Sequence, residues 1–238
     1  MTVLYVALAA VAATFVGGLF ALRFRDKLHL ILGLSAGMVA GVALFDLLPE
    51  AIELSAQYYE PSMVALFVAL GLFGYLILDR LILLHTHEEE GENVPRGFLG
   101  ASTLAAHSFL DGVAVGIGFQ ASVAVGIVVA VAVLAHGFSD GINTVNMILR
   151  NGGSWRRAFT WLFADAVAPA LGILAASFVQ VSVAHIGLLL AVFTGSFLYL
   201  SASDLIPESH HRHPRALTTI MTLLGAFVIY TVVRLVHS

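Results

Sequence analysis

The chain has 238 residues, of which 59% are hydrophobic and 11% are charged, and its mean hydropathy is +0.95. A soluble globular domain carries roughly 45–50% apolar and about 25% charged residues, so this composition excludes a soluble fold. The net charge of −4 indicates no particular partner, and the absence of cysteine excludes disulfides and thiolate metal ligands. Because the 22 glycines are scattered through the apolar runs, we expect an all-α polytopic membrane protein with closely packed helices.

Eight apolar segments reach the ~20 residues that a membrane-spanning helix needs. In chain order they cover about residues 2–22, 28–50, 62–84, 98–119, 122–149, 155–180, 183–208 and 214–236, and we assign residues 1–238 to a single transmembrane domain. Ten of the 11 Lys and Arg residues flank the connections between spans 1 and 2, 3 and 4, 5 and 6, and 7 and 8. Since basic residues mark the cytoplasmic side, the N- and C-termini are both predicted to lie outside.

Ionisable side chains recur inside the predicted spans, where burial in lipid is costly and function is the default explanation. Span 4 carries His107 and Asp111, and span 5 carries His136 and Asp140. The spacing of four residues places each pair on one face of its helix. Two imidazoles and two carboxylates form a mixed nitrogen and oxygen ligand set suited to Zn²⁺, Fe²⁺ or Mn²⁺. The sequence therefore predicts a central metal site, to which Ser108 is a candidate auxiliary ligand.

Two acidic segments repeat in spans 2 and 7, as Asp46-x-x-Pro-Glu50 and Asp204-x-x-Pro-Glu208. The charge-based orientation makes these two spans antiparallel, as in the inverted repeats of transporters. We expect the two segments to form acidic mouths on either side of the central site.

Other polar residues have a functional and a structural interpretation. Asn143 is a candidate for lining the pathway, and Asp165 is a candidate auxiliary ligand for which a packing hydrogen bond is an equal alternative. The histidines in the cytoplasmic connections are candidates for metal handling, and simple solvated loops explain them equally well: His85, His87, His210, His211 and His213.

The chain as a whole resembles the ZIP (Zrt-, Irt-like protein) family of divalent metal transporters. The resemblance rests on the eight spans, on His-Ser-x-x-Asp-Gly at 107–112, on His-x-x-x-Asp-Gly at 136–141, and on the Pro-Glu ends of spans 2 and 7. It implies a three-two-three helix plan, alternating access of one helix group against the other, and a homodimer.

The resemblance also assigns roles to particular residues. It implies that the transported metal is bound by His107, Ser108, Asp111, His136 and Asp140, with Asp165 and Asp204 near positions that supply further ligands. Span 5 departs from the family pattern His-x-x-Pro-Glu-Gly, because Ser139 and Asp140 replace Pro and Glu.

These observations predict ATP-independent transport of a divalent transition metal, with zinc first and iron or manganese as alternatives, and the resemblance implies that transport is into the cytoplasm. The metal is expected to be the substrate and not a cofactor. The expected partners are the metal ion and membrane lipid, with no nucleic acid, and the expected location is a prokaryotic inner membrane. Two alternatives stay open, an intramembrane zinc hydrolase and a metal-independent proton or solute carrier. The chain lacks His-Glu-x-x-His, so a transporter and not an enzyme is the favoured hypothesis.

Overall fold

The computed structural model describes residues 2–20, 28–87, 93–150, 152–210 and 216–236, and every regular element in these ranges is helical. The elements are α1 (Thr2–Phe20), α2 (Leu28–Val42), η2 (Ala43–Leu47), α3 (Leu48–Ser55), α4 (Pro61–His87), α5 (Asn93–Ala121), α6 (Val123–Arg150), α7 (Trp155–Ser177), α8 (Val183–Tyr199), η3 (Leu200–Leu205), α9 (Ile206–His210) and α10 (Ala216–Val236).

The eight predicted spans correspond to eight continuous helical segments. The elements α2, η2 and α3 follow one another without a break, as do α8, η3 and α9. Six of the segments are long and apolar enough to cross a membrane by length and composition, and α4 contributes a shorter apolar stretch, Pro61–Ile77. The structure therefore confirms the all-α polytopic class.

The two Asp-x-x-Pro-Glu repeats share one local backbone structure. In each repeat a π-helical stretch, η2 or η3, precedes the proline, which is Pro49 or Pro207. A proline lacks the helical N–H donor and crowds the preceding turn, and a π-bulge accommodates both effects without ending the helix. As a result the second helical segment continues to Ser55, beyond residue 50, where the predicted span ends.

The connection between α4 and α5 is shorter than the sequence suggested. The backbone of α4 continues through His87, and α5 begins at Asn93. His85 and His87 therefore belong to the last turns of α4 and not to a connecting loop.

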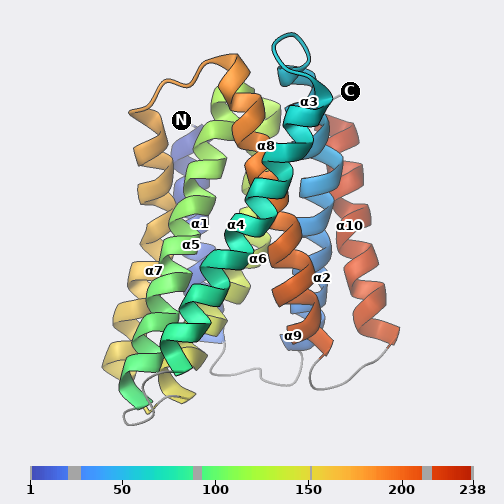
Figure 1. Cartoon of the computed structure of the whole chain (residues 1–238). Helices are drawn as coiled ribbons and strands as arrows, with labels where there is room; N and C mark the ends of the chain where they lie inside the picture. The colour runs from blue at the N-terminus through green and yellow to red at the C-terminus, as the bar shows by residue number, and fades with distance from the viewer. Residues whose placement is uncertain (1, 21–27, 88–92, 151, 211–215, 237–238) are drawn as a thin grey trace.

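The helices divide into two groups (Figure 1). The first group consists of α1, α5, α6 and α7, and the second consists of α2 with α3, α4, α8 with α9, and α10. The two groups meet where α2 contacts α6 and where α4 and α8 contact α5. The central pair α5 and α6 thus lies in the first group, with one side facing the second.

Close packing within the groups depends on glycine. Four helix pairs are each joined by two reciprocal glycines: Gly17 and Gly141 for α1–α6, Gly112 and Gly172 for α5–α7, Gly37 and Gly225 for α2–α10, and Gly71 and Gly195 for α4–α8. A Cβ atom at any of these positions would meet a backbone carbonyl of the partner helix. Small residues let membrane helices approach this closely. Among the described glycines, no such contact joins the two groups, so each group is closely packed within itself and less tightly joined to the other.

The same pairing agrees with the predicted inverted repeat. The π-helical stretches lie at corresponding places in the second and seventh segments. We match spans 1, 2 and 3 with spans 6, 7 and 8, and the two central spans, 4 and 5, with each other. The glycine-joined pair α1–α6 then corresponds to the pair α7–α5, and the pair α2–α10 corresponds to the pair α8–α4. This correspondence is the three-two-three plan.

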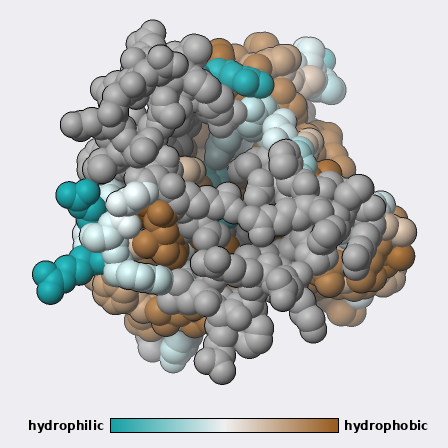
Figure 2. Space-filling view, turned by 90° about the horizontal axis from the view of Figure 1, so that it is seen from below, coloured by the Kyte–Doolittle hydropathy of each residue, from teal (hydrophilic) through white to brown (hydrophobic). Residues whose placement is uncertain are grey.

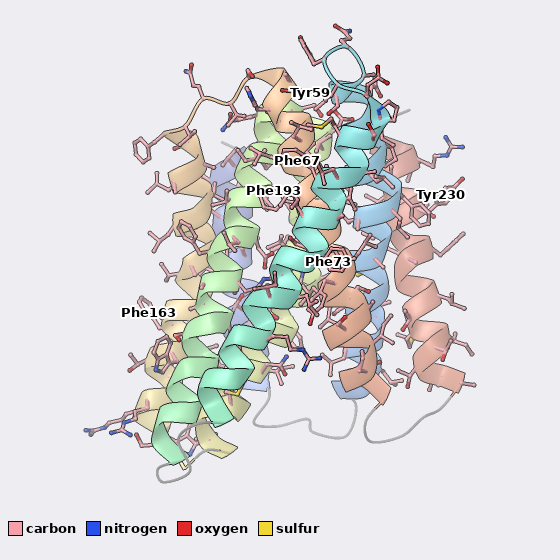
Figure 3. The ribbon with its side chains drawn as sticks, viewed as in Figure 1. Tyr59, Phe67, Phe73, Phe163, Phe193 and Tyr230 are labelled. Atoms are coloured by element: carbon pink, nitrogen blue, oxygen red, sulfur yellow. The ribbon has the colours of Figure 1, made fainter. Side chains whose placement is uncertain are left out.

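The outer surface of the bundle is apolar, and both chain termini lie at the same end (Figure 1). Phe163 of α7 and Tyr230 of α10 point away from the bundle on opposite flanks (Figure 3). Viewed from the end opposite the termini, the described residues form hydrophobic patches along parts of the rim, while hydrophilic residues project at one edge and are also visible nearer the centre (Figure 2). An apolar exterior around a more polar interior is the arrangement that a bilayer requires.

Gln120 joins the end of α5 to the connection that follows α7. Its Nε2 donates to the carbonyl oxygens of Ala176 and Val179 at 2.9 and 3.0 Å, and its Oε1 accepts from the Val181 N–H at 3.2 Å. We expect Gln120→Leu to lower the free energy of unfolding by about 1–3 kcal/mol, because backbone groups near the membrane lose their partners. Thermal unfolding of the purified protein in detergent measures the effect. The control is Gln57→Leu at an exposed position, and equal unfolding temperatures for the two variants would contradict the assignment.

Candidate metal centre

Four of the five predicted ligands come together where α5 and α6 lie side by side. His107 and Asp111 are on α5, and His136 and Asp140 are on α6. One ligand atom from each residue lies within 4.8 Å of all the others, and the four side chains are buried. The spacing of four residues on each helix brings both members of a pair to the same face, as the sequence indicated.

Asp111 is the centre of this cluster. Its Oδ2 atom lies 3.2 Å from Nε2 of His107 and 2.9 Å from Nε2 of His136. Asp140 is further away, with Oδ2 at 3.8 Å from Nε2 of His136. Zinc binds imidazole nitrogen and carboxylate oxygen at roughly 2.0–2.2 Å, and it commonly takes four such ligands. Two imidazoles and two carboxylates with donor atoms this close together can supply that donor set.

A backbone carbonyl fixes the orientation of the His136 ring. Nδ1 lies 2.8 Å from the carbonyl oxygen of Ala132, which can only accept a hydrogen bond, so Nδ1 carries a proton and donates it. Nε2 then faces Asp111, and a proton must lie between these two atoms to make their 2.9 Å contact a hydrogen bond. A metal ion can take the place of that proton, because both atoms are metal ligands once deprotonated.

The His107 ring is held through its other nitrogen. Nδ1 lies 3.0 Å from the hydroxyl of Tyr75 on α4. Nε2 is buried and has no hydrogen bond of acceptable geometry among the described residues, although it is close to Asp111. A buried polar atom without a hydrogen bond requires an explanation, and a role of Nε2 as a metal ligand provides one.

Ser108 points to a different carboxylate. Its Oγ donates to Oδ1 of Asp165 on α7 at 2.6 Å, and Thr144 of α6 donates to Oδ2 of the same residue at 2.8 Å. Asp165 is fully buried. It therefore joins α5, α6 and α7 next to the cluster, which agrees with a packing role and leaves the auxiliary ligand roles of Ser108 and Asp165 as predictions.

The remaining candidates lie outside the four-residue cluster. Asp46 is buried within η2, while Glu50 of α3 and Asn143 of α6 are half-buried. Their pathway roles stay predictions. Several candidate side chains or whole residues lie outside the described part of the chain: His85, His87, Asp204, Glu208, His210, His211 and His213.

The structure adds aromatic neighbours that the sequence patterns did not identify. Tyr75 meets His107 edge to face, with ring centroids 5.5 Å apart, and Phe197 of α8 lies 6.0 Å from the ring of His136. Both residues belong to the second helix group. For Tyr75, the sequence offered one indication of such a role: a tyrosine in the interior of an apolar span. A buried tyrosine hydroxyl usually has a hydrogen-bond partner.

Together, the fold and the site define a multi-pass helical membrane protein with a buried group of metal-type ligands at its centre. The model of one protein family, described as ZIP zinc transporter, matches residues 85–232, which is more than half of the chain. The chain belongs to the ZIP zinc transporter family. It is thus a member of a transporter family and not of an enzyme family.

Individual relatives match different portions of the chain. The chain is 26% identical over 242 residues to the zinc transporter ZupT of Shigella dysenteriae, and the match covers 94% of this chain and 93% of ZupT. It is 35% identical over 103 residues to the human zinc transporter ZIP4, which covers 43% of this chain and 16% of ZIP4. The metal cation symporter ZIP14 of Bos taurus is 34% identical over 106 residues, covering 43% of this chain and 21% of ZIP14.

Proposed function

We propose that this protein carries a divalent transition metal, with zinc as the first candidate, across the membrane and into the cytoplasm. The observation that carries the proposal is the buried cluster of His107, Asp111, His136 and Asp140 inside a multi-pass helical bundle. Family membership and the names of the relatives support it, since ZupT and ZIP4 are both called zinc transporters.

The charge of the cluster suits a dication. Two carboxylates buried next to each other repel strongly in a medium of low dielectric constant, so they need protons or a metal ion to balance them. The imidazoles add nitrogen donors, which favour borderline ions such as Zn²⁺ over Ca²⁺ or Mg²⁺. Iron and manganese have similar preferences and stay alternatives to zinc.

The division into two helix groups supports transport by alternating access. All four clustered ligands are on α5 and α6 of the first group. Two of them contact the second group, since His107 contacts Tyr75 and His136 contacts Phe197. Movement of one group against the other can therefore open the site first to one side of the membrane and then to the other, as in other transporters built from repeats. Inward direction, a homodimer and a bacterial inner membrane are part of the same proposal, from the family resemblance and the near full-length match to ZupT.

The hydrolase alternative is not favoured. A catalytic zinc site keeps an open coordination position for water, with three protein ligands, whereas structural sites are closed by four. Here four ligand-type side chains lie together, one more than the three that hold a catalytic zinc. The match to a zinc transporter family also supports transport over hydrolysis.

The test is uptake of radioactive Zn²⁺ by proteoliposomes that contain the purified protein, with Fe²⁺, Mn²⁺ and Cd²⁺ as competitors. We expect saturable uptake that is lost in His107→Ala and in Asp140→Ala and retained in His185→Ala, which removes an exposed histidine of α8. A wild-type protein that takes up no metal but holds stoichiometric, slowly exchanging zinc would refute transport and favour the hydrolase. Because protons balance the two carboxylates when no metal is bound, we also expect metal movement to be coupled to proton movement. A pH indicator inside the vesicles tests this coupling, and an unchanged internal pH during uptake would argue against it.

A further inference from the structure

Tyr75 connects the candidate metal centre to the helix group that holds none of its four clustered ligands. It lies on α4 of the second group and is half-buried, and its hydroxyl is 3.0 Å from Nδ1 of His107 on α5. Its ring also packs against Tyr199 at the end of α8, with centroids 5.4 Å apart. The hydrogen bond to His107 therefore crosses the boundary between the two groups.

We propose that Tyr75 is a positioning residue for the metal: its hydroxyl holds the His107 ring with Nε2 directed into the site. The inference rests on the proposed function, because it assigns a role around the same site. Partners of the outer nitrogen of a metal-binding histidine orient the ring and raise its basicity, and their loss typically costs about 10–100-fold in metal affinity.

A hydroxyl is suited to this histidine because it can both donate and accept a hydrogen bond. Without metal, the ring can carry its proton on Nε2 while the Tyr75 hydroxyl donates to Nδ1. With metal bound, Nε2 must present its lone pair to the ion, so the ring proton moves to Nδ1 and is donated to the Tyr75 oxygen. One phenol therefore satisfies Nδ1 in both states of the site.

His136 provides the internal contrast. Its Nδ1 faces the carbonyl of Ala132, which only accepts, and so the ring keeps one arrangement in which Nε2 is always directed at the cluster. Both partners of this contact are on α6, so a movement of the helix groups leaves the hydrogen bond intact. The partner of His107 belongs instead to the other helix group, so a displacement of the groups by a few ångströms breaks the hydrogen bond. Metal affinity is then highest in the arrangement described here and falls when the groups move apart.

The experiment compares wild type, Tyr75→Phe, Tyr75→Leu and Tyr230→Phe. Tyr75→Phe removes the hydroxyl and keeps the ring that packs on His107 and Tyr199, whereas Tyr75→Leu removes both. Tyr230→Phe makes the same chemical change on the exposed face of α10 and serves as the matched control. Equilibrium Zn²⁺ binding is measured on the detergent-purified protein, the visible spectrum of bound Co²⁺ reports the ligand set, and uptake by proteoliposomes gives KM and the maximal rate separately.

We expect Tyr75→Phe to weaken binding and raise KM about 10-fold or more, with a maximal rate within about two-fold of wild type, and with an altered Co²⁺ spectrum. Tyr75→Leu should weaken binding at least as much, and Tyr230→Phe should change neither quantity. Unchanged affinity in Tyr75→Phe together with a loss in Tyr75→Leu would overturn the inference, because the ring and not the hydroxyl would then matter. A lower maximal rate at unchanged KM would overturn it as well. If wild type binds metal but transports none, the proposed function fails, and the binding series alone decides the role of Tyr75.

Discussion

Replacing Asp111 with asparagine is expected to lower the affinity for Zn²⁺ by on the order of 100-fold or more and to abolish measurable uptake. Asp111 Oδ2 is the atom nearest to both imidazoles, at 3.2 and 2.9 Å from their Nε2 atoms. Removing one unit charge at about 4 Å from a cation costs about 4 kcal/mol per cation charge at an effective dielectric constant near 20, and each 1.4 kcal/mol is ten-fold in affinity. The asparagine amide can also donate to Nε2 of His136 and so occupy a ligand nitrogen.

Calorimetric zinc binding and vesicle uptake measure this effect. The side chain keeps its size in Asp111→Asn, so a thermal unfolding curve shows whether the variant is folded when its affinity is read. Glu53→Gln, which neutralises an exposed carboxylate of α3, is the matched control and should bind zinc as wild type does. Binding by Asp111→Asn with wild-type affinity would mean that the metal is held elsewhere.

Gly112→Ala is expected to separate α5 from α7 and to destabilise the protein by about 1–3 kcal/mol or more, the usual range for overpacking a closely packed site. The added Cβ would meet the backbone carbonyl of Pro169, which cannot move away as a flexible side chain can. Gly112 directly follows Asp111, and α7 carries Asp165, which is hydrogen-bonded to Ser108. We therefore expect metal uptake to fall together with stability.

Gly74→Ala is the matched control for this substitution. Gly74 also lies within a long helix, α4, but among the described residues no atom beyond its chain neighbours and the nearby backbone of α4 lies within 4 Å of the position that its Cβ would take. Alanine is favoured over glycine in a helix by up to about 1 kcal/mol, so this variant should be as stable as wild type or slightly more stable. Thermal unfolding in detergent and zinc uptake are measured for both variants. Equal loss in the two would show that any added methyl group at a helical glycine destabilises the protein, so that contact with Pro169 is not the cause.

The candidate metal centre was predictable to the extent that it depends on positions along single helices. A spacing of four residues puts His107 with Asp111 and His136 with Asp140 on one face whatever the rest of the fold does. Neighbouring spans joined by a short connection are antiparallel partners, which brought the two pairs together as predicted. The hydrogen bond of Ser108 could not be predicted, because its partner Asp165 lies 57 residues away on a helix whose rotation the pattern does not determine.

The long-range partners of the site required the tertiary structure. Tyr75 and His107 are 32 positions apart and belong to different helix groups. Nothing in the local sequence around Tyr75 specifies the angle at which α4 crosses α5, because that angle results from side-chain packing over the whole bundle. The backbone carbonyls that face Gly112 and Gly172 could not be predicted from sequence patterns for the same reason.

By itself, the sequence determined the class of protein, the eight helical segments, the common end of the two termini and the four candidate ligands that cluster in the structure. These features follow from composition, from runs of apolar residues and from spacing along one helix, all of which are local or additive properties. Only the tertiary structure decided which helices form each group, that Asp165 is bound by Ser108 and Thr144, and that Tyr75 reaches His107. The physical reason is that helix–helix packing in a membrane depends on matching surfaces between segments far apart in the chain, and this matching is a property of pairs of helices and not of either helix alone.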